Sequence, residues 1–158
     1  MKIRKASNND GQFILELIVR NSKDHFSPIW VIPEYQKPLI EQMQRTINAG
    51  ACPMPDGVYP SSIHVLVIEE RSVGFLWLLH RSEGVAEIYI MAIAPEHRRK
   101  GYAESLINNT LSTLEKGSTA TSRVKRKSRA MKDLLRKLGF QAKFALPFKV
   151  QHFFRAIS

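Results

Sequence analysis

The feature that most constrains the fold is a group of three apolar segments near the middle of the chain. They span residues 63–68, 73–79 and 85–94, and short polar turns separate them. Apolar runs of this length bounded by polar turns predict strands, and turns this short predict an antiparallel meander. The runs are apolar almost throughout rather than alternating with polar residues, so we expect helices to cover both faces of the sheet.

The segments on either side of this meander predict further helices and strands. Apolar residues at helical spacing occur in residues 14–18, 39–47, 106–114 and 131–138. Further strands are predicted at residues 3–6, 122–126, 144–146 and 150–156. A loop is predicted at residues 52–60, which hold three prolines and a glycine. This order predicts an α/β fold (an α+β sandwich) in a single domain over residues 1–158, with a mixed, mostly antiparallel central sheet flanked by helices on both faces.

Length and composition exclude several classes of protein. A chain of 158 residues fits one hydrophobic core, and 44% apolar with 24% charged residues is typical of a globular protein rather than a disordered one. No apolar run reaches the ~18 residues that span a bilayer, so we expect no association with the membrane interior. Cys52 is the single cysteine, which excludes an internal disulfide and a cysteine-based zinc site. No cleavable apolar stretch follows the basic N-terminus and no histidines have metal-ligand spacing, so we expect a cytoplasmic protein without a metal.

The charge of the chain is strongly positive. Lys and Arg total 24 against 14 Asp and Glu, which gives a net charge of +10. A field of this sign attracts polyanions such as nucleic acid, anionic lipid or a phosphate-rich cofactor. Many of the cations gather in residues 98–100 and 123–137. These windows are either binding surfaces or a solvated basic face.

The turn at residues 93–103 has the composition of a pyrophosphate cradle. It follows an apolar strand that ends at Pro95, and it opens an amphipathic helix. Gly101 and Ala103 are small, so a polyanion can approach the backbone there. The first N–H groups of a helix have no partners within the helix and lie at the positive end of its dipole. Such a turn binds phosphate groups, and the cations at 98–100 add fixed positive charge.

This turn resembles a known family signature. Arg98, Arg99, Lys100, Gly101, Tyr102 and Ala103 are similar to the Arg/Gln-x-x-Gly-x-Gly/Ala signature of the GNAT superfamily of acyl-CoA-dependent N-acyltransferases. The resemblance implies that acetyl-CoA is the cosubstrate and that the backbone amides of these six residues bind its pyrophosphate. It also implies that the backbone of Met91 and Ile93 binds the pantetheine, with the Met91 amide as oxyanion donor.

Glu87 is the candidate general base. Alternation along a strand predicts that Glu87, Tyr89, Met91 and Ile93 share one face of the sheet, on the side where the acetyl group lies. The sequence around Glu87 resembles the histone-acetylating branch of the family, where a glutamate at this place removes the amine proton. The alternative is that Glu87 pairs with Arg81 or Lys5 at the end of its strand.

Two positions depart from the pattern of the family. Many relatives carry Asn and Tyr where this chain has Ser128 and Leu135, and that tyrosine protonates the departing thiolate. Leu135 cannot donate a proton, so the role is unfilled or is supplied by water or by another side chain. Tyr89 is one candidate, but core packing is the favoured interpretation for an aromatic residue on a strand. Ser128 is predicted either to bind the pantetheine or to cap the following helix.

The acceptor is expected to be a small-molecule or protein amine that attacks the thioester directly in a ternary complex. By resemblance, His25, Phe26 and Trp30 border its site, and the basic surface favours an acceptor with an acidic part. Two other functions fit the sequence: a basic nucleic-acid or ribosome-associated binding protein, and a CoA-binding regulator with little catalysis. A homodimer is expected through the late strands, where Phe148, Val150, Phe153 and Phe154 supply apolar surface or else face the core.

Overall fold

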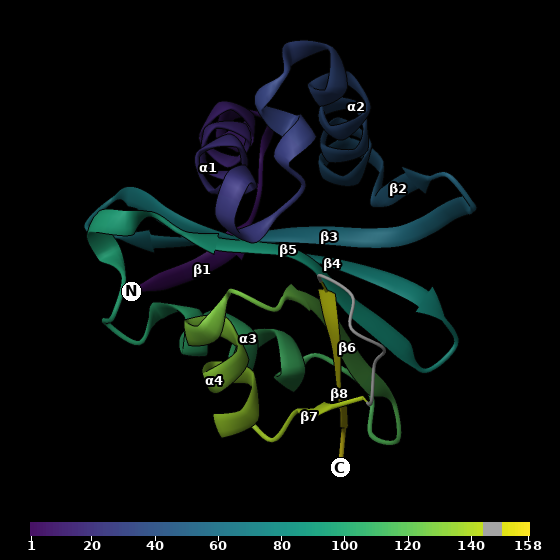
Figure 1. Cartoon of the computed structure of the whole chain (residues 1–158). Coiled ribbons are helices and arrows are strands. Elements are labelled where there is room, and N and C mark those ends of the chain that lie inside the picture. The colour runs from purple at the N-terminus through teal and green to yellow at the C-terminus, as the bar shows by residue number, and fades with distance from the viewer. Residues whose placement is uncertain (144–149) are drawn as a thin grey trace.

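The computed structural model describes residues 1–143 and 150–158, and within them it contains a central sheet with helices on both sides (Figure 1). The strands are β1 (Lys2–Lys5), β2 (Ala51–Met54), β3 (Gly57–Ile68), β4 (Arg71–Ser82), β5 (Val85–Ile93), β6 (Thr119–Lys125), β7 (Gln141–Ala142) and β8 (Val150–Ala156). The helices are α1 (Gly11–His25), α2 (Pro33–Ala49), α3 (Tyr102–Ser112) and α4 (Arg129–Lys137), with short 3₁₀ turns η1 (Asn8–Asp10), η2 (Pro28–Val31) and η3 (Pro95–His97).

The strands form one sheet in the order β1-β3-β4-β5-β6-β8-β7, and β2 pairs with β3 outside this path. The described pairings are antiparallel except for β5 with β6, which run parallel. The meander predicted from the three apolar segments is β3, β4 and β5. The predicted mixed, mostly antiparallel sheet is therefore confirmed.

Helices cover both faces of the sheet, as the continuous apolar strands predict. In Figure 1, α1 and α2 lie on one side of the sheet, and α3 and α4 lie on the other. Each side has its own cluster of buried side chains, one built around α1 and α2 and one around α3, α4 and the late strands. Strand β4 is shared by both clusters, and its residues 73–79 are buried throughout.

The predicted loop at residues 52–60 is wrong. These residues form a hairpin in which Ala51 lies opposite Pro60 and Met54 opposite Gly57. Prolines suggest a loop because they cannot donate a backbone hydrogen bond. Pro53, however, lies on β2, which pairs with β3 on one side only. An edge strand tolerates a missing donor on its open side.

The predicted late strands are described in part. The strand predicted at 144–146 and Phe148 lie outside the described residues. Strand β8 matches the prediction at 150–156, and Phe153 is buried in the core at 1% exposure. Phe153 therefore takes the second of its two predicted roles and faces the core.

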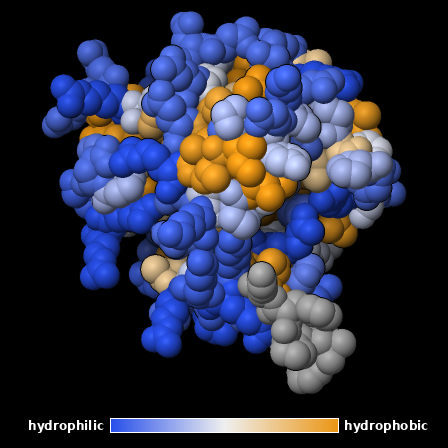
Figure 2. Space-filling view, turned by 45° about the horizontal axis from the view of Figure 1, so that its top comes forward, coloured by the Kyte–Doolittle hydropathy of each residue, from blue (hydrophilic) through white to orange (hydrophobic). Residues whose placement is uncertain are grey.

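The side of the molecule above α1 and α2 carries an apolar patch. Figure 2 turns this side toward the viewer and shows hydrophobic residues grouped among hydrophilic ones. The large exposed apolar side chains of this part are Ile29, Val31, Ile32 and Tyr35, from η2 and the start of α2. Among the described residues no helix has the length and apolar character needed to cross a membrane.

Two irregularities of β5 open the sheet. The register between β4 and β5 shifts by one residue between the pairs Trp77–Ile90 and Leu78–Ile88, so Tyr89 is an extra residue, a β-bulge. Pairing between β5 and β6 covers only residues 85–88 and 119–122. Beyond Ile88 the two strands diverge, and the gap between them leads toward α3.

Candidate functional site

A cavity of about 490 Å³ fills the space between the diverging strands. Its walls come from β5, β6, the turn before α3, the first half of α3, the end of α1 and the start of α4. Eight of the residues predicted to bind the cofactor or the oxyanion line it, namely Met91, Ile93, Arg98, Arg99, Gly101, Tyr102, Ala103 and Ser128, whereas Lys100 does not. The structure thus gathers most of the predicted turn and strand around one cavity.

The expectation that Glu87, Tyr89, Met91 and Ile93 share one face of the sheet is wrong. Met91 and Ile93 pack in the cluster on the α3/α4 side, whereas Tyr89 packs with the α1/α2 side. The contacts of Glu87 are with residues of that second side as well. The bulge at Tyr89 is the reason, because one extra residue reverses the alternation of side chains along a strand.

The backbone of β5 beyond the bulge faces the cavity at the predicted positions. The Ala94 N–H donates to the Val73 carbonyl at 2.8 Å, which makes these two residues a hydrogen-bonded pair. Hydrogen-bonded and non-hydrogen-bonded pairs alternate in an antiparallel ladder, so Met91 and Ile93 form the non-hydrogen-bonded pairs with β4. Their N–H and C=O groups therefore point away from β4, toward the side where β6 has diverged.

The turn before α3 presents unpaired amides to the same cavity. Gly101 has φ +80°, and no heavy atom lies within 4 Å of the place where a Cβ would stand. Within the described chain, the N–H groups of residues 99–104 donate no hydrogen bond, and the next amide, that of Ser105, donates to the Gly101 carbonyl at 3.1 Å. The Arg98 amide, also predicted to bind the pyrophosphate, instead donates to the Pro95 carbonyl at 3.3 Å. A row of free amides at a helix N-terminus, with open space before it, fits an anionic phosphate group.

The two arginines of the turn differ in their surroundings. The Arg98 guanidinium donates to the Ile93 carbonyl at 3.2 Å and also to Asn21 Oδ1. It thereby ties the end of β5 to α1. Arg99 lines the cavity and has φ +61°. Beside them, His97 Nδ1 is buried without a hydrogen-bond partner in the described structure. The turn therefore holds unused donors and fixed positive charge in one place.

Comparison with known proteins agrees with this arrangement. The family model of the acetyltransferase (GNAT) domain matches residues 60–142, more than half of the chain. The chain belongs to the GNAT acetyltransferase family. The prediction made from the turn at 98–103 is confirmed at this level: the protein is a GNAT-type, acetyl-CoA-dependent acetyltransferase.

Solved structures share the GNAT fold over nearly the whole chain. The PaiA N-acetyltransferase of Thermoplasma acidophilum, solved with coenzyme A, has a TM-score of 0.73 at 15% identity, with 98% of each chain covered. A GNAT-family acetyltransferase of Staphylococcus aureus reaches 0.74 at 13% identity, with 99% of each chain covered. A chimera of the spermidine N-acetyltransferase SpeG from Vibrio cholerae and hSSAT reaches 0.67 at 20% identity, covering 98% of this chain and 94% of that one. At these identities the likeness is one of fold alone, and no curated protein matches the sequence.

One hydrogen bond joins two distant elements of the GNAT cavity wall. His25 Nδ1 lies 2.7 Å from Ser128 Oγ, which links the end of α1 to the start of α4. Ser128 stands at the N-cap of α4, but its hydroxyl makes no capping bond to the helix. Burial lowers the pKa of His25, with help from the positive charge of Arg98, and both favour the neutral imidazole. Because the Ser128 hydroxyl contacts His25 and makes no capping bond, the predicted capping role of Ser128 is wrong.

Of the other residues predicted to border the acceptor or to protonate the thiolate, only some line the cavity. Phe26 lines it, while Trp30 does not and packs against Phe26 with ring centroids 6.4 Å apart. Leu135 lines the cavity, so the position where many relatives carry tyrosine has no proton donor in this chain. Burial raises the pKa of Tyr89 to about 12, and its hydroxyl donates to Gln42 Oε1 at 3.0 Å. Tyr89 also lines the cavity, but its hydroxyl is directed to α2.

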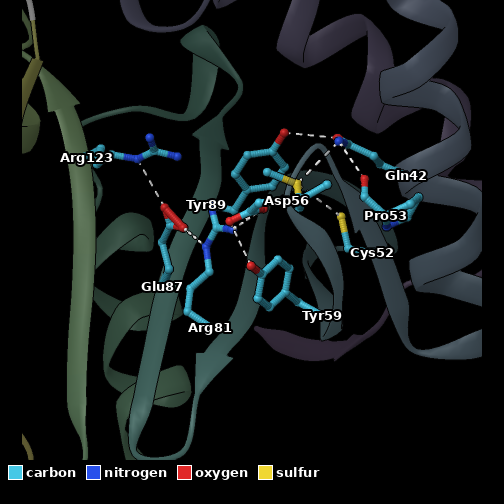
Figure 3. Close-up of polar contacts among 10 residues, drawn as sticks. Gln42, Cys52, Pro53, Asp56, Tyr59, Arg81, Glu87, Tyr89 and Arg123 are labelled. Carbon is cyan, nitrogen blue, oxygen red and sulfur yellow. Dashed lines mark hydrogen bonds and ion pairs between the residues drawn. The ribbon is translucent and has the colours of Figure 1, made fainter.

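Glu87 does not line the GNAT cavity but is the centre of an ion-pair network on the α1/α2 side (Figure 3). Arg81 Nε lies 2.8 Å from Glu87 Oε2, and Arg123 Nε lies 3.2 Å from Glu87 Oε1. The alternative prediction that Glu87 pairs with Arg81 is confirmed, and the second partner is Arg123. Each carboxylate oxygen of Glu87 thus has one arginine partner.

Further members of the network were missed by the sequence analysis. The Arg81 guanidinium lies over the Tyr59 ring at 4.8 Å, and the Tyr59 hydroxyl donates to Asp56 at 2.8 Å. These residues come from the hairpin that was predicted as a loop, so no sequence signal placed them beside β4. Cys52 is buried nearby, and burial raises the pKa of its thiol to about 11, which keeps it protonated. No group of residues suited to hold a metal occurs in the described part of the chain.

Proposed function

We propose that this GNAT protein transfers the acetyl group of acetyl-CoA to a primary amine by direct attack in a ternary complex. The observation that carries the proposal is the row of free amides at residues 99–104, which opens onto the cavity between β5 and β6. The pyrophosphate of coenzyme A fits these amides, with Arg98, Arg99 and Lys100 adding positive charge. The backbone of Met91 and Ile93 and the hydroxyl of Ser128 are proposed to bind the pantetheine.

The chemistry is an exchange of one bond for another. Acetyl-CoA supplies the acetyl group as a thioester. The amine nitrogen forms a bond to the carbonyl carbon, the carbon–sulfur bond breaks, and the sulfur leaves with the electron pair while the amine loses a proton. The Met91 N–H is proposed to donate to the carbonyl oxygen as negative charge develops there. The sequence predicts that Glu87 accepts the amine proton, a role that the Glu87→Gln variant tests.

Replacing Gly101 tests the cofactor site. Gly101→Leu fills the open space in front of the amides, and we expect the affinity for acetyl-CoA to fall at least tenfold, or about 1.4 kcal/mol. Isothermal titration calorimetry with acetyl-CoA measures this directly. The matched control is Gly84→Leu, because Gly84 has φ +74° and open surroundings but lies in the turn before β5, away from the cavity.

The control separates backbone strain from loss of the site. Both substitutions strain a left-handed backbone, so both lower the melting temperature, but only Gly101→Leu weakens acetyl-CoA binding. Equal affinities for the two variants would show that the turn does not contact the cofactor. Absence of saturable acetyl-CoA binding by the unsubstituted protein would overturn the proposed function.

A further inference from the structure

We infer that the acceptor is a small primary amine that also carries a carboxylate, and that Arg81 and Arg123 bind this carboxylate. The inference rests on the proposed function and names the class of acceptor for the same site. It starts from a second pocket on the α1/α2 side of the sheet, lined by Met54, Pro55, Asp56, Tyr59, Arg81 and Arg123.

The second pocket adjoins the cavity of the cofactor site. Arg123 alone among the described residues lines both. It stands on β6 directly after Ser122, the last residue of β6 that pairs with β5. The two strands diverge from that point, so a molecule in the second pocket borders the gap through the sheet. An amine held there can reach the cavity that the thioester would occupy.

The charges around the pocket favour an anionic ligand group. One buried carboxylate, Glu87, with its side chain 7% exposed, is shared by two guanidinium groups. Only Nε of each arginine contacts it, and the terminal nitrogens of Arg123 donate to no other group of the described chain. Two guanidinium charges thus share one carboxylate, and both arginines line the second pocket.

The remaining acid at the pocket is too exposed to neutralise this charge firmly. Asp56 Oδ1 lies 3.7 Å from Arg81 Nη1, and the Asp56 side chain is 68% exposed. Exposed pairs of this kind contribute little because water screens them. A carboxylate of the acceptor can therefore displace Asp56 from Arg81 at small cost.

Arg81 is already held in place for such a ligand. Its Nε donates to Glu87, and its guanidinium carbon lies over the Tyr59 ring (Figure 3). A guanidinium with a fixed plane binds a carboxylate through two parallel hydrogen bonds with little further loss of freedom. A diamine or polyamine in the same pocket would bring a second positive charge next to Arg81 and Arg123, which repel it. The pocket therefore selects amino acids over polyamines.

The test compares amines of equal length that differ in one end group. The probes are ω-amino acids with one to five methylene groups, the n-alkylamines and the α,ω-diamines of matching length. Release of the coenzyme A thiol gives kcat/KM for each, and calorimetry measures acceptor binding to the protein saturated with coenzyme A. We expect kcat/KM for the best ω-amino acid to exceed that of its alkylamine at least tenfold, and that of its diamine by more.

Variants of the two arginines connect this preference to the pocket. In Arg81→Gln and Arg123→Gln the ratio of kcat/KM between the ω-amino acid and the alkylamine should fall at least tenfold. Arg71→Gln is the matched control, because Arg71 is an exposed arginine at the opposite end of β4 and its loss changes the net charge equally. Thermal melts of all three variants identify any that fail to fold, and Arg123→Lys then restores part of the ratio.

The outcomes separate this inference from the proposed function. Equal or better turnover and binding of diamines by a protein that binds acetyl-CoA would overturn the acceptor class and leave the function standing. No saturable binding of any ω-amino acid to the complex with coenzyme A would also overturn it. A failure to bind acetyl-CoA would overturn both.

Discussion

One residue of β5 decides which side chains can meet. Tyr89 is the extra residue of the bulge, and it directs Glu87 to one face of the sheet and Met91 to the other. Strict alternation placed them together, because the sequence carries no local signal for an inserted strand residue. The predicted turn at 98–103 needed no long-range information, since glycine, small residues and a helix start are adjacent in the chain.

At the same scale, Glu87→Gln distinguishes two roles of the carboxylate. If Glu87 holds the guanidinium groups, its loss misplaces the anchor for the acceptor carboxylate. We expect KM for the ω-amino acid to rise about tenfold, equivalent to about 1.4 kcal/mol, while kcat changes less than about threefold. Steady-state kinetics at saturating acetyl-CoA measures both values.

The opposite pattern would support the predicted base. A fall in kcat of about a hundredfold or more, with KM unchanged, is the result expected from removal of a general base. Glu83→Gln is the control, because Glu83 is an exposed carboxylate in the turn before β5. Acetyl-CoA binding should be the same in all three proteins.

At the scale of elements, the apolar pattern of the sequence predicts the central strands correctly but does not predict the edge strand β2. Residues 73–79 are buried on both sides of the sheet, so the pattern reports their position directly. The hairpin of β2 and β3 contains prolines, and β2 tolerates Pro53 because it pairs with β3 on one side only. The local sequence does not show whether a strand lies at the edge of the sheet, because this depends on how the strands pair.

Gly74 tests how closely β4 and β5 must approach beside the cavity. A Cβ at Gly74 would lie 2.5 Å from Ile93 Cδ1 and 2.9 Å from the Ala92 carbonyl oxygen. The side chain of Ile93 can turn aside, but the backbone oxygen must shift with its strand. We expect Gly74→Ala to lower the free energy of unfolding by about 1–3 kcal/mol, measured by urea denaturation.

The control for this change is Gly11→Ala in α1. Its Cβ would meet only Met43 Cε, at an ordinary 3.8 Å. Because alanine favours a helix more than glycine does, we expect this variant to be as stable as the unsubstituted protein or more stable. If both variants have the same stability, the approach of β4 to β5 leaves more space than the distances indicate.

At the scale of the whole molecule, we expect the net charge of +10 to contribute to cofactor binding. The phosphates of acetyl-CoA are attracted by the whole positive field, which salt screens. We expect the dissociation constant to rise about three- to tenfold when sodium chloride increases from about 50 to about 300 mM. Calorimetric titrations at both concentrations measure the change.

The control ligand is S-acetylpantetheine, which carries the thioester without phosphates. Its affinity should be nearly independent of salt, because it has no charge for the field to act upon. If salt leaves the affinity for acetyl-CoA unchanged, the basic surface does not take part in cofactor binding. The basic residues at 123–137 would then be tested against RNA and DNA.

The opening between β5 and β6 has a consequence for how the substrate specificity of such a protein can evolve. The residues inferred to bind the acceptor, Arg81 and Arg123, come from β4 and β6, and Tyr59 of β3 lies against Arg81 on the same face. The turn at 98–103, which is proposed to bind the cofactor, leads into α3 on the other face (Figure 1). Substitutions that redirect the enzyme to a new amine can therefore accumulate on the first face while the inherited handling of the thioester is preserved on the second. The specificity for the acceptor amine and the specificity for the acetyl donor can therefore change independently.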